Sequence, residues 1–115
     1  MNSVTLIGNL GADPETTALP SGTKVSSFRV AVGDVYGTGD NKTEKTYWFS
    51  CKTFGKLAEI VEQHLSKGSR IGLHGKLIHE EWEKDGQKKS AVRIIADRID
   101  FLSWKTSQGE ELQPF

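Results

Sequence analysis

The sequence predicts an all-β domain with one helix, and three observations support this fold class. Short segments rich in β-branched and aromatic residues recur along the chain, and turn residues separate them. A single segment near the middle shows helical periodicity instead. With 115 residues, the chain has the length of one domain, which can bury about two-thirds of its unfolded surface. We therefore expect no second domain.

The first two strands are predicted over residues 4–11 and 28–32. Between them, Pro20 and Gly22 occupy the second and fourth positions of a type I turn. In the second strand, apolar side chains alternate with the others, which is the period of a strand with one buried face. Val25 is out of that register, so we expect a bulge before residue 28.

The third strand and the helix follow in the middle of the chain. Residues 47–54 are rich in residues that favour strands. Apolar residues then recur at helical spacing over about residues 56–66, and Gly68 is placed to end that helix. The helix therefore connects the third strand to the fourth.

The last two strands form a predicted hairpin over about residues 70–82 and 89–102. The dipeptide Asp85-Gly86 between them favours a tight turn. Gly72 and Gly75 permit the sharp bending that a small closed barrel requires. Five strands with one helix between the third and the fourth is the order of the OB fold. This fold is a five-stranded Greek-key barrel that often binds oligonucleotides.

One face of the third strand carries aromatic rings beside polar groups. Trp48, Ser50, Lys52 and Phe54 share this face, and the opposite, more apolar face is the natural core side. Most aromatic residues in strands belong to the core. Rings beside cations suit a single strand of nucleic acid, because bases stack on rings and cations follow phosphates. Two more aromatic residues stand among polar neighbours. The candidate DNA-binding residues are the aromatic residues Tyr36, Trp48, Phe54 and Trp82 and the cations Arg29, Lys52, Lys56, Lys67 and Lys76.

The composition limits what kind of protein this is. Fifteen Lys and Arg balance fifteen Asp and Glu, so net charge gives no support for nucleic-acid binding, and this interpretation depends on the local arrangement of residues. The lone Cys51 has no internal disulfide partner, and we interpret it as a small buried hydrophobe. No signal peptide and no membrane-length apolar run are recognisable, so we expect a cytoplasmic protein that does not associate with membranes.

Catalytic and metal-binding patterns are weak. His74 and His79 point to opposite faces of a regular strand, so we expect no metal site. The sequence shows neither a phosphate-binding P-loop nor a nucleophile with an evident partner. We therefore expect neither an enzyme nor a bound cofactor. A nuclease would need clustered carboxylates, which the sequence does not place together.

Over residues 1 to about 104, the chain closely resembles the bacterial single-stranded DNA-binding proteins, the SSB family. The matching motifs are NSVTLIGNLG at residues 2–11, Asp13-Pro14-Glu15, Phe54-Gly55-Lys56-Leu57-Ala58-Glu59 and Lys67-Gly68-Ser69. The resemblance implies a homotetramer that binds single-stranded DNA with little regard to sequence, in DNA replication, recombination and repair at the bacterial nucleoid. It also implies stacking of bases at the positions of Tyr36, Trp48, Phe54 and Trp82.

The first of two departures from the family pattern affects the expected binding. Glu80 and Glu81 stand where the family often has Arg and Lys, and Ser50 stands where it often has Arg. Fewer phosphate contacts should follow. The acids near Trp82 also favour an alternative, an OB-fold adaptor of a replication complex that binds protein and has weak affinity for DNA.

The second departure concerns residues 105–115, which are polar and which we expect to form a short mobile tail. Relatives usually carry a long linker with an acidic tip, and the residues here resemble a shortened version of it. A terminal ring and nearby carboxylates can enter a pocket with a basic rim on replication and repair proteins. The alternative is a frayed end without a partner. The candidate partner-binding residues are Glu110, Glu111, Pro114 and Phe115.

Overall fold

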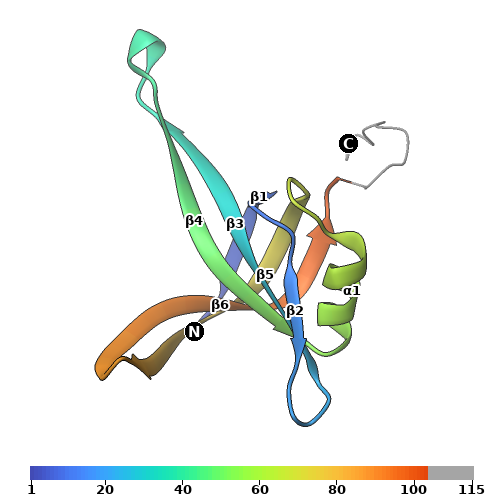
Figure 1. Cartoon of the computed structure of the whole chain (residues 1–115). Coiled ribbons are helices and arrows are strands. Elements are labelled where there is room, and N and C mark those ends of the chain that lie inside the picture. The colour runs from blue at the N-terminus through green and yellow to red at the C-terminus, as the bar shows by residue number, and fades with distance from the viewer. Residues whose placement is uncertain (104–115) are drawn as a thin grey trace.

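Strands dominate the structure, a computed structural model that describes residues 1–103. They are β1 (Val4–Leu10), β2 (Glu15–Ala18), β3 (Lys24–Tyr36), β4 (Thr43–Phe54), β5 (Arg70–Lys84) and β6 (Gln87–Phe101). Helix α1 covers Lys56–His64, and a short 3-10 turn, Gly39–Asn41, joins β3 to β4. Between β4 and β5 the chain passes over one end of the barrel as α1 (Figure 1). The predicted tail lies outside the described residues.

The strands close into the predicted barrel. They pair in the order β1-β5-β6-β4-β3-β2, and β1 also pairs with β3 through Asn9 opposite Ala31 and Leu10 opposite Val30. That additional pairing closes a five-stranded barrel, while β2 is added to the free side of β3. The predicted OB fold is therefore confirmed. Strand β2 was not predicted, because its sequence Glu-Thr-Thr-Ala carries no apolar alternation.

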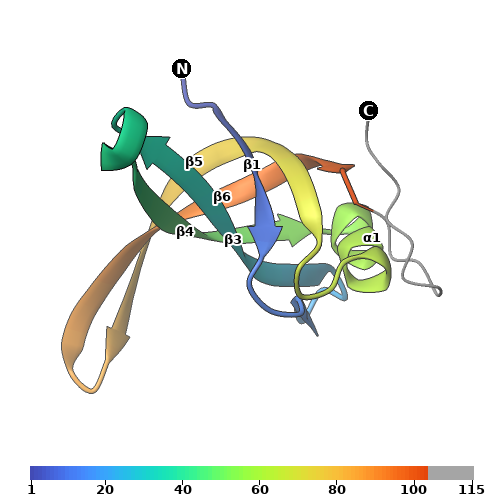
Figure 2. The same ribbon diagram turned by 90° about the horizontal axis from the view of Figure 1, so that it is seen from above.

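Two hairpins extend beyond the barrel as arms (Figures 1 and 2). One arm consists of the ends of β3 and β4, whose pairing continues to Tyr36 opposite Thr43. The other consists of β5 and β6, and it turns at Asp85 and Gly86, which have φ values of 53° and 77°. Positive φ at both positions is what a type I′ turn requires, so the predicted hairpin is confirmed. The predicted strands were too short at 28–32 and 47–54, since both reach into the first arm.

The position of the bulge differs from the prediction. β3 pairs with β4 without interruption from Val25 onward, so the bulge expected at Val25 is wrong. Val25 lies opposite Phe54, on the face away from the core residue Phe28. The register shift occurs instead between His74 and Gly75 on β5. A Cβ at Gly75 would lie 2.1 Å from the Ile95 carbonyl oxygen, so only glycine permits this close approach of β5 to β6.

The barrel core is small and sealed by the helix. Val30, Ile71 and Ile94 are among its fully buried side chains, and α1 buries Ala58 and Val61 against it. Two buried hydroxyls are satisfied by carbonyl groups: Ser26 Oγ donates to Ala58 O at 2.8 Å, and Thr53 Oγ1 donates to Ala96 O at 3.1 Å. Within residues 1–103, no helix is long and apolar enough to cross a bilayer.

Cys51 belongs to this core, as predicted. It is almost completely buried, and burial raises the pKa of its thiol to about 12. The thiol therefore stays protonated at neutral pH and behaves as a small apolar group. Tyr47 shares the face of β4 that was expected to be the core side, but it remains 38% exposed because it lies where β4 leaves the barrel for the arm.

Candidate nucleic-acid interface

The strand register brings most of the candidate residues onto one surface, which we call the outer face. Paired residues project to the same side of a sheet, and Lys52 on β4 is opposite both Ser27 on β3 and Ile95 on β6. Alternation along each strand extends this surface across β3, β4, β6 and β5. Its members include Arg29 on β3, Trp48, Lys52 and Phe54 on β4, Lys76, Glu80 and Trp82 on β5, and Arg93 on β6.

Three aromatic rings of the outer face are open to solvent. Trp48 is 49% exposed, Phe54 42% and Trp82 41%. A buried ring would gain about 25 cal/mol for each Å² removed from water, so this exposure is costly and the core interpretation does not apply to these residues. Tyr36 is equally exposed, but alternation along β3 places it on the opposite side of the arm from Trp48. The fold therefore places three of the four predicted rings on one face.

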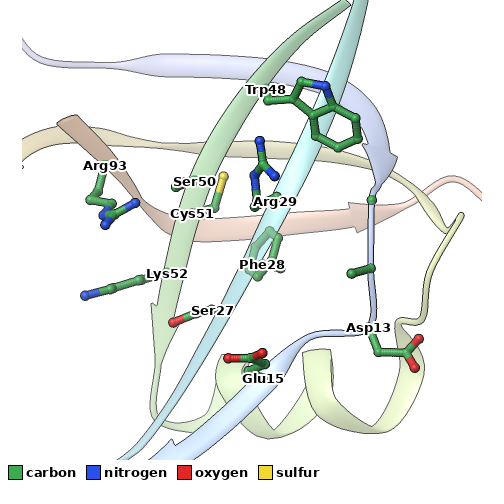
Figure 3. Close-up of a pocket in the computed structure, with 12 residues that line it drawn as sticks. Asp13, Glu15, Ser27, Phe28, Arg29, Trp48, Ser50, Cys51, Lys52 and Arg93 are labelled. Atoms are coloured by element: carbon green, nitrogen blue, oxygen red, sulfur yellow. The ribbon is translucent and has the colours of Figure 1, made fainter. Parts of the chain in front are cut away.

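A cleft of about 360 Å³ lies in the outer face beside Trp48. Figure 3 shows Arg29 pointing towards the Trp48 ring, with Lys52 and Arg93 projecting from the neighbouring strands. The Arg29 guanidinium carbon lies 4.8 Å from the ring centroid, which is a cation–π contact. Glu15 and Asp13 lie at the other end of the cleft. Aromatic surface and positive charge are thus combined within the dimensions of a small ligand group.

Glu80 is held between two cations of the outer face. Its Oε1 lies 2.9 Å from Lys52 Nζ, and its Oε2 lies 3.9 Å from Arg93 Nε. The three side chains are about 27% to 31% exposed, so their charges are only partly screened by water. Glu81 projects to the other face of β5, where its carboxylate lies 3.6 Å from His79 Nδ1. The two neighbouring acids therefore occupy different environments.

Arg93 is a cation of the outer face that was not predicted from the sequence. Its guanidinium carbon lies 5.9 Å from the Trp82 ring centroid, and its side chain lines the cleft. Its Nε is buried and has no hydrogen-bond acceptor among residues 1–103. A buried N–H without an acceptor is costly, and the Glu80 carboxylate at 3.9 Å is too far away to accept a hydrogen bond from it. Alternation in β6 carries the signal, because Arg93 lies on the side opposite the buried Ile94.

The other predicted cations lie at different places. Lys76 is exposed on the outer face, opposite Ile95. Lys56 is the first residue of α1, directly after the turn that follows Phe54. Lys67 lies in the loop between α1 and β5, where its backbone N–H donates to Asp13 Oδ1 at 2.8 Å. Neither Lys56 nor Lys67 lines the cleft, so these two lysines lie at the margin of the site.

A hydrogen-bonded series that the sequence did not indicate lies away from the outer face. Ser3 Oγ lies 2.9 Å from His74 Nε2, and His74 Nδ1 lies 2.8 Å from Asp97 Oδ1. The order resembles a catalytic triad. However, Ser3 and Asp97 are exposed, and Ser3 lines neither this cleft nor a second one beside His74. We therefore assign the series to the attachment of β1 to β5 and β6. Among the described residues, no three His, Cys, Asp or Glu side chains are grouped to hold a metal ion.

Comparison with known proteins relates this geometry to a family. The model of the single-strand binding protein family matches residues 1–102. A "Single-stranded DNA-binding protein" of Aquifex aeolicus is 40% identical over 114 residues, which are 98% of this chain and 76% of the relative. "Single-stranded DNA-binding protein 1" of Xylella fastidiosa is 41% identical over 113 residues, which are 96% of this chain and 83% of the relative.

Two solved structures have the same fold. A deletion mutant of the single-stranded DNA binding protein from Thermus aquaticus superposes with a TM-score of 0.79 and 33% identity, covering 97% of this chain and 54% of that one. The Plasmodium falciparum SSB complex with ssDNA superposes with a TM-score of 0.77 and 26% identity, covering 87% of this chain and 91% of that one.

Proposed function

Because the chain belongs to the single-strand binding protein family, we propose that it coats single-stranded DNA without reading its sequence and thereby protects it during replication, recombination and repair. The observation that supports this most directly is the outer face, where three half-exposed aromatic rings are interspersed with cations. The DNA-binding domain covers residues 1–104. It acts in the cytoplasm, at the nucleoid, where single-stranded DNA arises.

Binding divides between stacking and charge. Bases stack on Trp48, Phe54 and Trp82, because every base has a π-face and stacking does not depend on sequence. Phosphates contact the cations of the outer face. The DNA then continues past Lys56 and Lys67, which lie at the margin of the site. Tyr36 contacts the DNA where the DNA passes around the arm formed by β3 and β4. The cations that meet phosphates are Arg29, Lys52, Lys76 and Arg93, with Lys56 and Lys67 at the margin.

A fluorescence titration tests this function. Adding oligo(dT) to the full chain should quench tryptophan emission, because Trp48 and Trp82 come to lie under bases. Oligo(dC) of equal length should give a similar affinity, and a duplex of the same length should bind much more weakly. If oligo(dT) neither quenches the emission nor changes its own electrophoretic mobility, the proposed function is wrong.

Two other functions, a protein-binding adaptor and a nuclease, have less support. The protein-binding adaptor depended on the acids near Trp82, but Glu80 is engaged by Lys52 and Arg93 and is not presented to a partner. The nuclease would need grouped carboxylates, and the family relatives are named for binding. We therefore propose a protein that works without catalysis, metal or cofactor.

A homotetramer is the proposed assembly. Its support is the family membership together with apolar side chains that one copy leaves in water. Ile7 on β1 is 52% exposed, and Leu77 and Val92 are 44% and 61% exposed on the face of the second arm that lies opposite Trp82. A symmetric assembly would bury such side chains in isologous contacts. Light scattering should then give about four times the chain mass of 12.7 kDa, whereas a stable monomer at micromolar concentration would exclude the tetramer.

The tail is proposed to recruit replication and repair proteins, although its residues lie outside the described part of the chain. Glu110, Glu111, Pro114 and Phe115 combine a ring with carboxylates, which fits a pocket with a basic rim. Four tails on one tetramer would raise avidity without improving any single contact. Deleting residues 113–115 should leave DNA affinity almost unchanged and abolish the capture of partners from a bacterial lysate. An identical set of captured proteins would contradict this role.

A further inference from the structure

Gly11, which follows β1, leaves the space that the Trp48 ring occupies. A Cβ at this position would lie 2.3 Å from Cζ3 and 2.7 Å from Cη2 of Trp48, and the third nearest atom, at 3.5 Å, also belongs to that ring. The Gly11 N–H donates to the Arg29 carbonyl at 3.1 Å, which fixes this point of the backbone against β3. The benzene edge of the Trp48 indole therefore packs directly against the backbone of residue 11.

Glycine is needed at position 11 because the Trp48 ring occupies the space of a side chain, and not because of the backbone conformation. Gly11 is absent from the described glycines with positive φ, which are Gly22, Gly37, Gly39, Gly55, Gly68 and Gly86. An alanine therefore fits the backbone conformation of residue 11. Its methyl group would collide only with the end of a side chain that can rotate. The substitution should move the ring and leave the barrel intact.

We propose that Gly11 is a positioning residue for DNA binding, which acts by holding the Trp48 ring in its stacking position. This inference rests on the proposed function. Arg29 covers one face of the ring at 4.8 Å, and Gly11 supports its edge, so the ring is in place before DNA arrives. Ordering a free side chain on binding costs affinity, by about 2-fold to 10-fold. A ring displaced from Gly11 incurs that cost and stacks less well.

The test compares matched glycine substitutions in the full chain. Gly11→Ala should weaken oligo(dT) binding by about 5-fold, with an unchanged melting temperature. Gly72→Ala is the control, because the nearest atom to an added Cβ at Gly72 lies at an ordinary contact distance of 3.8 Å, Gly72 does not have positive φ, and it lines the second cleft beside His74 and not the outer face. It should bind as the parent does. In a Trp48→Ala background, Gly11→Ala should cause no further loss, because the residue through which it acts is gone.

A readout without DNA separates this inference from the proposed function. In a variant that carries W82F and W104F, Trp48 is the only tryptophan, and Gly11→Ala should shift its emission and raise its quenching by acrylamide. Unchanged emission, or an equal loss of affinity with and without Trp48, would overturn the positioning role. If the parent does not bind oligo(dT) at all, the proposed function fails, and the emission of free Trp48 still decides whether Gly11 places the ring.

Discussion

Replacing Trp48 with alanine is expected to weaken single-stranded DNA binding by about 1 to 3 kcal/mol, or roughly 5-fold to 150-fold, without unfolding the barrel. The expectation follows from the position of the ring, which is 49% exposed and rests on Gly11 and Arg29 outside the core. Trp82→Ala should have an effect of the same size, because this ring lies under Arg93 on the same face. Titration of oligo(dT) by anisotropy measures both losses.

The control for these variants comes from the same strand. Tyr47→Ala removes a ring of comparable exposure, 38%, from the opposite face of β4, and it should leave DNA affinity almost unchanged. Thermal melting shows whether each variant still unfolds cooperatively. If Trp48→Ala lost its cooperative transition but kept its affinity per folded molecule, the ring would belong to the core and the outer face would not be the binding surface.

The sequence predicted correctly those features that depend only on neighbouring residues of one segment. Period-two alternation in residues 47–54 placed Trp48, Lys52 and Phe54 together, and the exposure of these side chains agrees with that assignment. The turn at Asp85-Gly86 was equally local, because its two positive φ values are a property of the dipeptide. Strand lengths were less predictable. The arms have no core behind them, so their residues carry no apolar alternation that would mark the strand ends.

Features that depend on pairing between distant strands could not be predicted. Arg93 reaches the site because β6 lies between β4 and β5, and no local pattern gives that order. The same arrangement brings Glu80 to Lys52. Alternation along β3 does predict that Tyr36 lies on the other side from Arg29, but only once the strand is known to continue that far. The period of the sequence thus predicts on which face of its own strand a residue lies. The order of the strands in the sheet decides which residues of different strands come together.

The ion pairs of Glu80 with Lys52 and Arg93 predict that Glu80 and Glu81 have different effects on DNA binding. Glu80→Gln removes the carboxylate that competes with phosphates for Lys52 and Arg93, so both cations contact phosphates more fully. We expect several-fold stronger binding at low salt. The slope of log K against log salt should steepen by about 0.7 for each cation that gains a phosphate on single-stranded DNA. Measuring affinity for oligo(dT) between low and moderate salt concentrations gives that slope directly.

Glu81→Gln is the matched control, because it removes the same charge from the next residue but from the opposite face of β5, beside His79. An effect of net charge alone would be similar in both variants, since each removes one negative charge from adjacent residues of the same strand. Release of Lys52 and Arg93 would appear only in Glu80→Gln. Equal slopes in the two variants would therefore mean that Glu80 does not compete with phosphate, and that the DNA does not follow the path across Lys52 and Arg93.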